Sequence, residues 1–316
     1  MIDLLNQKLN TNHGGSVMAY QELSLLQFRK KFSTELACQK VLGKIRWPNG
    51  FVCPKCAHTR AYKRPKRHLL ECAGCGYQAS LTAGTIFHNT RTPLLKWFWA
   101  IYLASQDKGG VSAMRLSKQL ELGYKTAWAM LHKIRKAMGQ RDSRYTLSGS
   151  IEMDDAFFGG TGKGKRGRGA TNKTTVMVMV ESKGEKAGFI AMQTMESVTG
   201  ERVEKFTQER LEPGQKIRTD GLRAFSILGE IGHQHDGRPI PGKQAHEELP
   251  WVHIAISNAK RFLLGTYHGV SRKYLQDYLN EFCYRFNRRS WEKQLTDRLM
   301  TACITANPVT FAELKG

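Results

Sequence analysis

Residues 53–77 read CPKCAHTRAYKRPKRHLLECAGCGY and hold two C-x-x-C pairs, Cys53 with Cys56 and Cys72 with Cys75. Two such pairs can close four thiolates around one ion in a tetrahedral site, and zinc suits four soft sulfur ligands. A segment this short builds little core, so the metal would supply much of its folding free energy. Two disulfides or four unrelated thiols are the alternatives, and disulfides would need an oxidising compartment. The spacing predicts a zinc ribbon around one structural zinc ion.

The whole chain has 316 residues, 41% of them hydrophobic, which suggests two or three folded domains. It has no apolar run long enough to cross a membrane, and its first residues do not resemble a signal peptide. The remaining cysteines, Cys38, Cys283 and Cys303, stand among apolar residues and are expected to be buried free thiols. A reducing cytoplasm suits all seven cysteines.

The net charge of +22 is the second large clue, with 49 Lys and Arg against 27 Asp and Glu. Such an excess is costly through self-repulsion unless a polyanion neutralises it, and nucleic acid is the expected partner. Two basic runs concentrate the charge: Arg60, Lys63, Arg64, Lys66 and Arg67 between the cysteine pairs, then Lys163, Lys165, Arg166, Arg168 and Lys173 among glycines. Either run alone could be a solvated loop, but both together beside a zinc ribbon favour contact with phosphates.

Changes in composition divide the chain into five predicted segments. They are a polar lead (1–18), an N-terminal helical segment (19–50), the zinc ribbon (51–90), a helix-turn-helix region (91–140) and a larger domain (148–316). In the second segment, the apolar spacing predicts one amphipathic helix from Gln21 to Leu42. We expect a multidomain protein that combines α+β and α/β parts.

The predicted helix-turn-helix region begins with an apolar helix over 94–104. Two helices over 112–120 and 124–138 follow, joined by a short turn that contains Gly123, as in DNA-reading helix pairs. An ordinary helical hairpin is the alternative. The second helix is expected to bury Ala127, Leu131 and Ile134 and to present a polar, basic face with Lys125, Thr126, His132, Lys133, Arg135 and Lys136.

From residue 148 the pattern becomes that of an α/β domain. Strands are predicted over 150–158, 174–181, 188–195 and 216–219, a helix over 199–211, and closing helices over 257–264, 271–287 and 291–307.

Acidic residues interrupt the apolar strand over 150–158. Because a strand alternates its faces, Glu152 and Asp154 should lie on one side and Asp155 on the other. Asp220 follows the strand over 216–219 in T-D-G, where glycine lets the backbone turn away. Carboxylates from two adjacent strand ends are the hard oxygen ligands that Mg²⁺ prefers, and a pair of such ions can assist phosphoryl transfer. Taken alone, either aspartate is more often a turn or cap residue.

Motifs in a fixed order run from about Leu36 to Arg289. They are CPKC with CAGCGYQ, LTAGTIFHNTRTPLLKWF, KTAWAMLHKIR, EMDDAFFGG with KRGRG, then TDG, SNAK, GTYH and EFCYRFNRR. In these motifs the chain resembles the zinc-ribbon DDE transposases of bacterial insertion sequences, the ISXO-type group or insertion-sequence family fifteen-ninety-five. The resemblance implies a ribonuclease H-like catalytic domain of mixed-sheet type that cuts and joins DNA ends with two Mg²⁺ or Mn²⁺ ions.

Carried onto this chain, the resemblance makes Asp154 and Asp220 the first two catalytic residues. The general pattern ends in Glu, whereas this chain has Asn258, followed by Lys260, as in a variant with an Asp, Asp, Asn and Lys pattern. An asparagine oxygen can ligate Mg²⁺ but brings no charge. Asn258 could instead cap a helix, and the candidates to replace it are Glu247, Glu248 and His253. Lys260 or Arg261 is expected to hold a DNA phosphate.

The resemblance predicts a transposase that binds the terminal inverted repeats of an insertion sequence and performs metal-dependent cleavage and strand transfer. Its partners would be double-stranded DNA at the ends and at the target, with no membrane, and pairing two ends implies a homodimer or larger assembly. A bacterial cytoplasmic, nucleoid-associated protein is expected. A catalytically inactive DNA-binding regulator and a nuclease without strand transfer are the alternatives.

Overall fold

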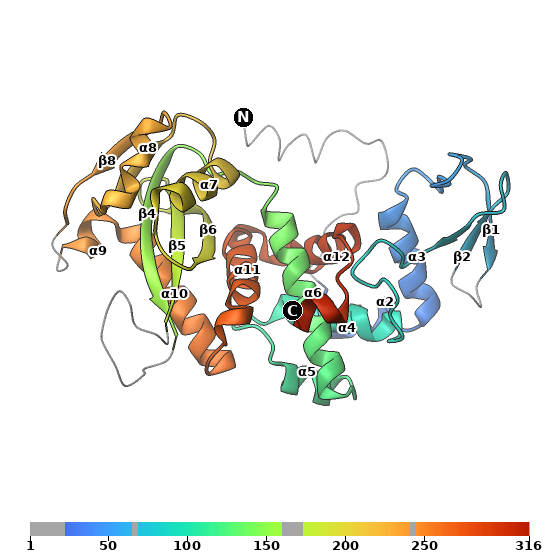
Figure 1. Ribbon diagram of the computed structural model, residues 1–316. Coiled ribbons are helices and arrows are strands. Elements are labelled where there is room, and N and C mark those ends of the chain that lie inside the picture. The colour runs from blue at the N-terminus through green and yellow to red at the C-terminus, as the bar shows by residue number, and fades with distance from the viewer. Residues whose placement is uncertain (1–22, 65–68, 160–172, 241–243, 316) are drawn as a thin grey trace. The chain divides into compact units, whose positions relative to one another are not determined.

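The computed structural model describes residues 23–64, 69–159, 173–240 and 244–315 (Figure 1). The chain forms two compact units, one of Met1–Gln106 with Trp291–Gly316 and the other of Asp107–Ser290. This division differs from the predicted segments 91–140 and 148–316. The C-terminal helices belong to the first unit and not to the larger domain, because α12 (Leu295–Thr305) packs on α3 (Glu35–Arg46) and α4 (Leu94–Gln106) of the first unit.

The first unit joins a small sheet to a group of helices. The sheet is antiparallel, in the order β1 (Ala61–Arg64), β2 (Leu69–Cys72) and β3 (Gln78–Ser80). The described helices are α2 (Leu25–Lys31), α3 (Glu35–Arg46), α4 (Leu94–Gln106), α12 and α13 (Phe311–Lys315). The described cysteines are all free thiols, and Cys38 and Cys303 are buried in this unit, as predicted.

The prediction of a single helix from Gln21 to Leu42 is wrong, because a short non-helical segment separates α2 from α3. Thr34 is the N-cap of α3, since its hydroxyl accepts the N–H of Ala37. The Glu35 carboxylate then accepts the N–H groups of Leu94 and Leu95, at 2.8 and 3.0 Å, and so caps α4. A side chain from one helix therefore satisfies the first turn of another.

The second unit contains a mixed five-stranded sheet. Its strands are β4 (Ser150–Phe158), β5 (Thr174–Ser182), β6 (Ala187–Met195), β7 (Lys216–Thr219) and β8 (Gln234–Gly237), in the order β6-β5-β4-β7-β8. The first three pair antiparallel, whereas β7 is parallel to β4 and β8 is parallel to β7. This is the strand order and direction of the ribonuclease H-like fold, which confirms the predicted mixed sheet. The edge strand β8 was not predicted, because its sequence QHDG has no apolar residue.

The helices of this unit are α5 (Ala113–Gln119), α6 (Tyr124–Asp142), α7 (Gly200–Arg210), α8 (Ile227–Glu230), α9 (Ala245–Glu248), α10 (Pro250–Tyr267) and α11 (Leu275–Phe286). α10 and α11 cover one face of the sheet and α7 and α8 the other, whereas α5 packs on α6, α6 on α11 and α9 on α10. Ala156 and Phe158 of β4 pack with α10 and α11, whereas Ile151 and Met153 pack with α7 on the other face. No helix in the described part of the chain combines the length and apolarity needed to span a membrane.

The interface of α6 with α11 is built from buried charges. Arg135 is 2% exposed and its guanidinium lies 2.8 Å from the carboxylate of Glu281, which is 3% exposed. His132 is fully buried and lies 2.9 Å from Asp277. The prediction that His132 and Arg135 belong to an exposed basic face is therefore wrong. The predicted inward face is confirmed, because Ala127, Leu131 and Ile134 are buried.

Glu281→Ala is expected to lower the free energy of unfolding by about 3–5 kcal/mol, because Arg135 would stay buried without its anionic partner. Urea denaturation of the full chain measures this loss. Glu196→Ala is the matched control, since it removes the exposed ion pair with Arg202 and should cost less than about 1 kcal/mol. Equal losses in the two variants would contradict the role assigned to the buried pair.

Candidate metal centres and nucleic-acid interface

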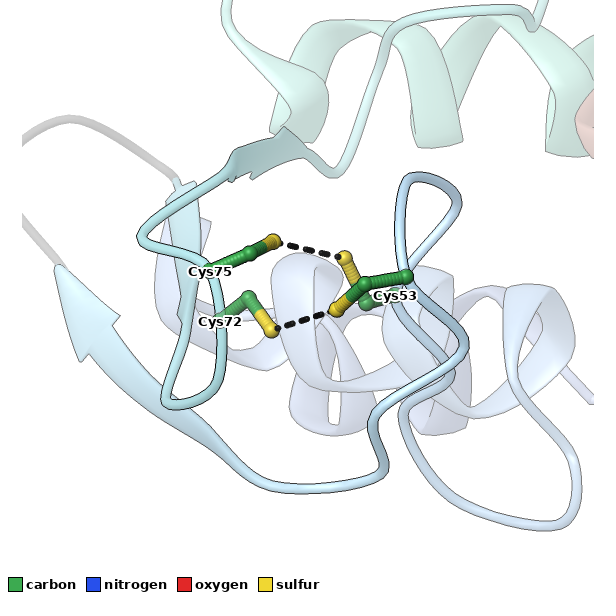
Figure 2. A group of neighbouring side chains, drawn as sticks. Cys53, Cys72 and Cys75 are labelled. Atoms are coloured by element: carbon green, nitrogen blue, oxygen red, sulfur yellow. Dashed lines mark hydrogen bonds between the residues drawn. The ribbon is translucent and has the colours of Figure 1, made fainter.

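The four cysteine sulfurs of the ribbon converge on one point. Their Sγ atoms all lie within 4.8 Å of one another, with Cys53 3.6 Å from Cys75 and Cys56 3.5 Å from Cys72 (Figure 2). A tetrahedral zinc with bonds of about 2.3 Å spaces its sulfurs by about 3.8 Å. The four cysteines therefore fit one structural zinc ion, as the spacing predicted.

The two cysteine pairs are folded alike. In each pair, the first sulfur accepts the backbone N–H two residues on, from Lys55 to Cys53 and from Gly74 to Cys72, both at 3.4 Å. The turns then close with Ala57 and Gly76 in left-handed backbone conformations, at φ values of 58° and 67°. These N–H groups point at the sulfurs that carry negative charge when metal is bound, so the backbone stabilises the thiolate form.

A second candidate centre lies where β7 ends, beside Asp154 in the middle of β4. Parallel pairing aligns Glu152 of β4 with Arg218 of β7, and the same register carried two residues further brings Asp154 level with Asp220. Neighbouring strands lie about 4.8 Å apart, so the two carboxylates share one edge of the sheet. Asp220 accepts the N–H of Leu222 at 3.1 Å, which orients its carboxylate.

Gly221 permits the turn after Asp220. Its φ is +76°, and a Cβ at this position would come within 2.8 Å of the carbonyl carbon of Arg238. Any other residue would have to displace that backbone segment. The glycine of the T-D-G motif therefore has the role predicted for it, since it lets the chain leave the sheet directly after the carboxylate.

Glu152 positions α10 across this edge. Its side chain is buried, and its Oε2 accepts the N–H groups of Trp251 and Val252 at 2.8 and 2.9 Å. Burial raises the pKa of Glu152, although these two N–H groups oppose the shift. A carboxylate of β4 thus serves as the cap of α10, whose own N-cap residue Leu249 makes no side-chain hydrogen bond.

α10 brings His253 and Lys260 to the aspartates. The Nε2 of His253 lies 3.8 Å from the Oδ2 of Asp154, and these side chains are 20% and 14% exposed. Lys260 is seven residues later, so it lies within about 20° of His253 around the helix axis. The ammonium of Lys260 interacts electrostatically with Asp154 and lies 5.6 Å from the ring centre of Phe158.

Asn258 lies elsewhere on the helix. It is five residues after His253, a rotation of about 140°, and its Oδ1 accepts a hydrogen bond from Arg261 at 3.2 Å. Asn258 and Lys260 both lie on α10, two residues apart, so they do not share a face of the helix. The assignment of Asn258 as the third catalytic residue stays a prediction. Glu248 is also engaged elsewhere, with Arg218 at 2.6 Å, and Glu247 is exposed on α9.

Burial dominates the electrostatics of the basic groups at this site. Desolvation, and next the neighbouring His246, lower the pKa of His253, while Asp220 opposes the shift. The pKa of Lys260 is also lowered, by burial and then by Lys173, while Asp154 opposes the shift. Lys260 further borders a cavity of about 580 Å³ that His268 and Arg272 also line. Lys260 and Arg272 therefore bring two cationic side chains to this cavity, whose described lining includes neither Asp154 nor Asp220.

The predicted DNA-binding residues differ in their surroundings. Arg60, Lys63, Lys125 and Thr126 are exposed, as is Arg261, whereas Arg64 pairs with Glu71 at 2.9 Å and Lys133 is half-buried. Lys66, Arg67, Lys163, Lys165, Arg166 and Arg168 lie outside the described residues. Arg288, in the EFCYRFNRR motif, is only 6% exposed and is bound to Asp142 at 2.6 Å, so its charge is used inside the protein.

Comparison with known proteins gives the family context for both centres. Residues 33–78 match the transposase zinc-ribbon domain, and residues 146–287 match the ISXO2-like transposase domain. A relative from Halobacterium salinarum, an uncharacterized protein in transposable element ISH50, is 28% identical over 88% of this chain and 98% of its own.

Two solved structures are also similar, a pre-cleavage Mos1 transpososome and the Mos1 strand transfer complex. Their identities are 12% and 13%, over 67% and 68% of this chain and 78% of each other chain, with TM-scores of 0.25 and 0.26. The two domain matches, in contrast, together span more than half of the chain and contain the four cysteines and both aspartates. The chain belongs to the ISXO2-like transposases that carry a zinc-ribbon domain.

Proposed function

We propose that this protein is a DNA transposase that binds the terminal repeats of its element, cleaves DNA there and joins the freed ends to target DNA. The observation that carries this proposal is the pair Asp154 and Asp220 on neighbouring parallel strands of the matched transposase domain, Asp154 in the middle of β4 and Asp220 directly after β7. The chemistry of the two carboxylates suits Mg²⁺ or Mn²⁺.

Asp154 and Asp220 would hold the divalent ions. When bound, such ions supply charge stabilisation for the attacking and leaving oxygens of an in-line displacement at phosphorus. Lys260 would bind a phosphate oxygen beside Asp154, and Glu152 would keep α10 in place so that this ammonium stays at the sheet edge.

Two displacements make up the reaction. In the first, a water oxygen forms a bond to phosphorus, and the bond from phosphorus to the 3′ oxygen breaks, leaving a 3′-hydroxyl. In the second, that 3′ oxygen forms a bond to a target phosphorus and displaces the target's own 3′ oxygen, which takes up a proton. Neither step consumes a further reactant.

DNA recognition is assigned to two elements. The α5–α6 pair would act as a helix-turn-helix, because Lys125 and Thr126 are exposed at the start of α6, where base edges are usually read. The ribbon would bind phosphates through its exposed Arg60 and Lys63. Pairing two ends requires at least two copies of the chain on DNA. We place this activity in the bacterial cytoplasm, at the nucleoid.

Incubation of the full chain with Mg²⁺ or Mn²⁺ and duplexes that carry the element's inverted ends tests the proposal. We expect cleavage that exposes a 3′-hydroxyl, followed by joined products when target DNA is added. Binding without any cleavage would instead favour the inactive regulator. Cleavage without joined products would favour a nuclease.

A further inference from the structure

We propose that His253 supplies the third ligand of the divalent-metal site, so that the site combines two carboxylates with one imidazole nitrogen and favours Mn²⁺ over Mg²⁺. This inference rests on the proposed function, because it concerns the same site. The Glu of the general transposase pattern and the amide of Asn258 would each supply an oxygen as the third ligand, whereas His253 would supply a nitrogen.

The geometry of α10 carries the assignment. His253 is the first residue after the two whose N–H groups Glu152 binds, so the same buried carboxylate that starts the helix also places this ring. Its Nε2 is 3.8 Å from the Oδ2 of Asp154, a separation that two ligands of one ion can have when each bond is about 2.1 Å. Lys260 stands two turns further along on the same side, toward Asp154.

The other candidates do not reach this position. Asn258 is rotated away and holds Arg261, and Glu248 is bound to Arg218. Among the described residues, only the four ribbon cysteines bring three or more such ligand atoms within 4.8 Å of one another. In the group Asp154, Asp220 and His253, the ligand atoms of at least one pair therefore lie more than 4.8 Å apart. Binding one ion to all three would require a side-chain rotation that shortens this distance.

The ligand type determines the preferred ion. Mg²⁺ strongly favours oxygen ligands and keeps several of its waters, whereas imidazole raises the affinity of ions later in the divalent series. Mn²⁺ accepts both carboxylate and imidazole, so replacing a carboxylate by His253 should widen the gap in affinity between Mn²⁺ and Mg²⁺. His253→Glu should lower the ratio of the Mn²⁺ affinity to the Mg²⁺ affinity by about tenfold.

Pulsed electron paramagnetic resonance of Mn²⁺ bound to the zinc-loaded full chain tests the proposal without relying on activity. We expect modulation from a directly bound ¹⁴N, which changes to the ¹⁵N pattern when only histidine is labelled with ¹⁵N. Because labelling leaves the protein unaltered, this measurement does not depend on the folding of a variant. Coordination of Mn²⁺ by oxygen alone in the wild-type protein would overturn the assignment. Mn²⁺ binding that Asp154→Asn does not weaken would overturn it as well.

Two variants make the assignment specific. His253→Glu should still bind Mn²⁺ but lose the nitrogen modulation, whereas His246→Asn should keep it. His246 is the matched control because its ring centre lies only 4.7 Å from that of His253. Modulation that disappears with His246 instead would overturn the proposal. Failure of DNA cleavage with an intact nitrogen signal would reject the proposed function while leaving the ligand assignment standing.

Discussion

Asp154→Asn and Asp220→Asn should each reduce cleavage of end DNA by about a thousandfold or more, with little change in binding to the same duplex. Each substitution keeps the size of the side chain but removes one of the charges that hold the divalent ions. An ion that stabilises charge at phosphorus contributes several kcal/mol to the transition state, and about 4 kcal/mol corresponds to a thousandfold. Single-turnover cleavage and gel-shift titration on one duplex measure the two effects separately.

Asp155→Asn is the matched control for this experiment. It makes the same chemical change one residue away, but Asp155 points from β4 toward the opposite face of the sheet from Asp154. We expect cleavage by this variant to stay within a few-fold of wild type. A similar loss in Asp154→Asn and Asp155→Asn would indicate that charge near the strand, rather than a ligand at the sheet edge, controls the reaction.

Local pattern was sufficient for the elements that carry the two aspartates. The strands predicted over 150–158 and 216–219 have the observed bounds of β4 and β7, and alternation along β4 placed Glu152 and Asp154 on one face. These features depend on neighbours in the chain, so the sequence contains them directly. The pairing of β4 with β7 could only be inferred from the family resemblance, because it joins segments about 60 residues apart.

His253 was named from the sequence only as one of three candidates to replace Asn258, and the start of α10 was misjudged. A helix predicted from Ser257 excludes His253, so nothing in the sequence placed this ring beside Asp154. The observed helix starts at Pro250, yet it lacks the usual Ser, Thr, Asp or Asn at its N-cap. Its cap is Glu152, about a hundred residues earlier, and no local signal reveals such a partner.

The basic residues of α6 were misjudged for a related reason. His132 and Arg135 look like solvent-exposed charges when α6 is considered alone. Their partners Asp277 and Glu281 belong to α11, about 145 residues away, and the four side chains bury one another. Charge pattern therefore identified the polar start of α6, at Lys125 and Thr126, but not its packed middle.

Removal of the ribbon zinc should have the largest effect on folding of any change in the first unit. The described part of the ribbon buries only a few apolar side chains, among them Ala79 of β3 and Leu81 directly after it, so the sheet has little core to hold it. A structural zinc contributes about 10–16 kcal/mol in small domains of this kind. Cys72→Ser should therefore abolish binding of the one zinc ion and unfold the ribbon.

Elemental analysis and limited proteolysis distinguish this outcome from a general loss of stability. Zinc should fall from one per chain to none in Cys72→Ser, and new cleavage should appear between residues 51 and 80 while residues 107–290 stay intact, because that unit has its own cores. Cys38→Ala is the matched control, since it removes a buried thiol of the same unit that lies outside the cluster. It should keep its zinc even if it lowers stability. Full zinc content in Cys72→Ser would show that three thiolates and a water suffice, and the ribbon would then not depend on a closed four-sulfur site.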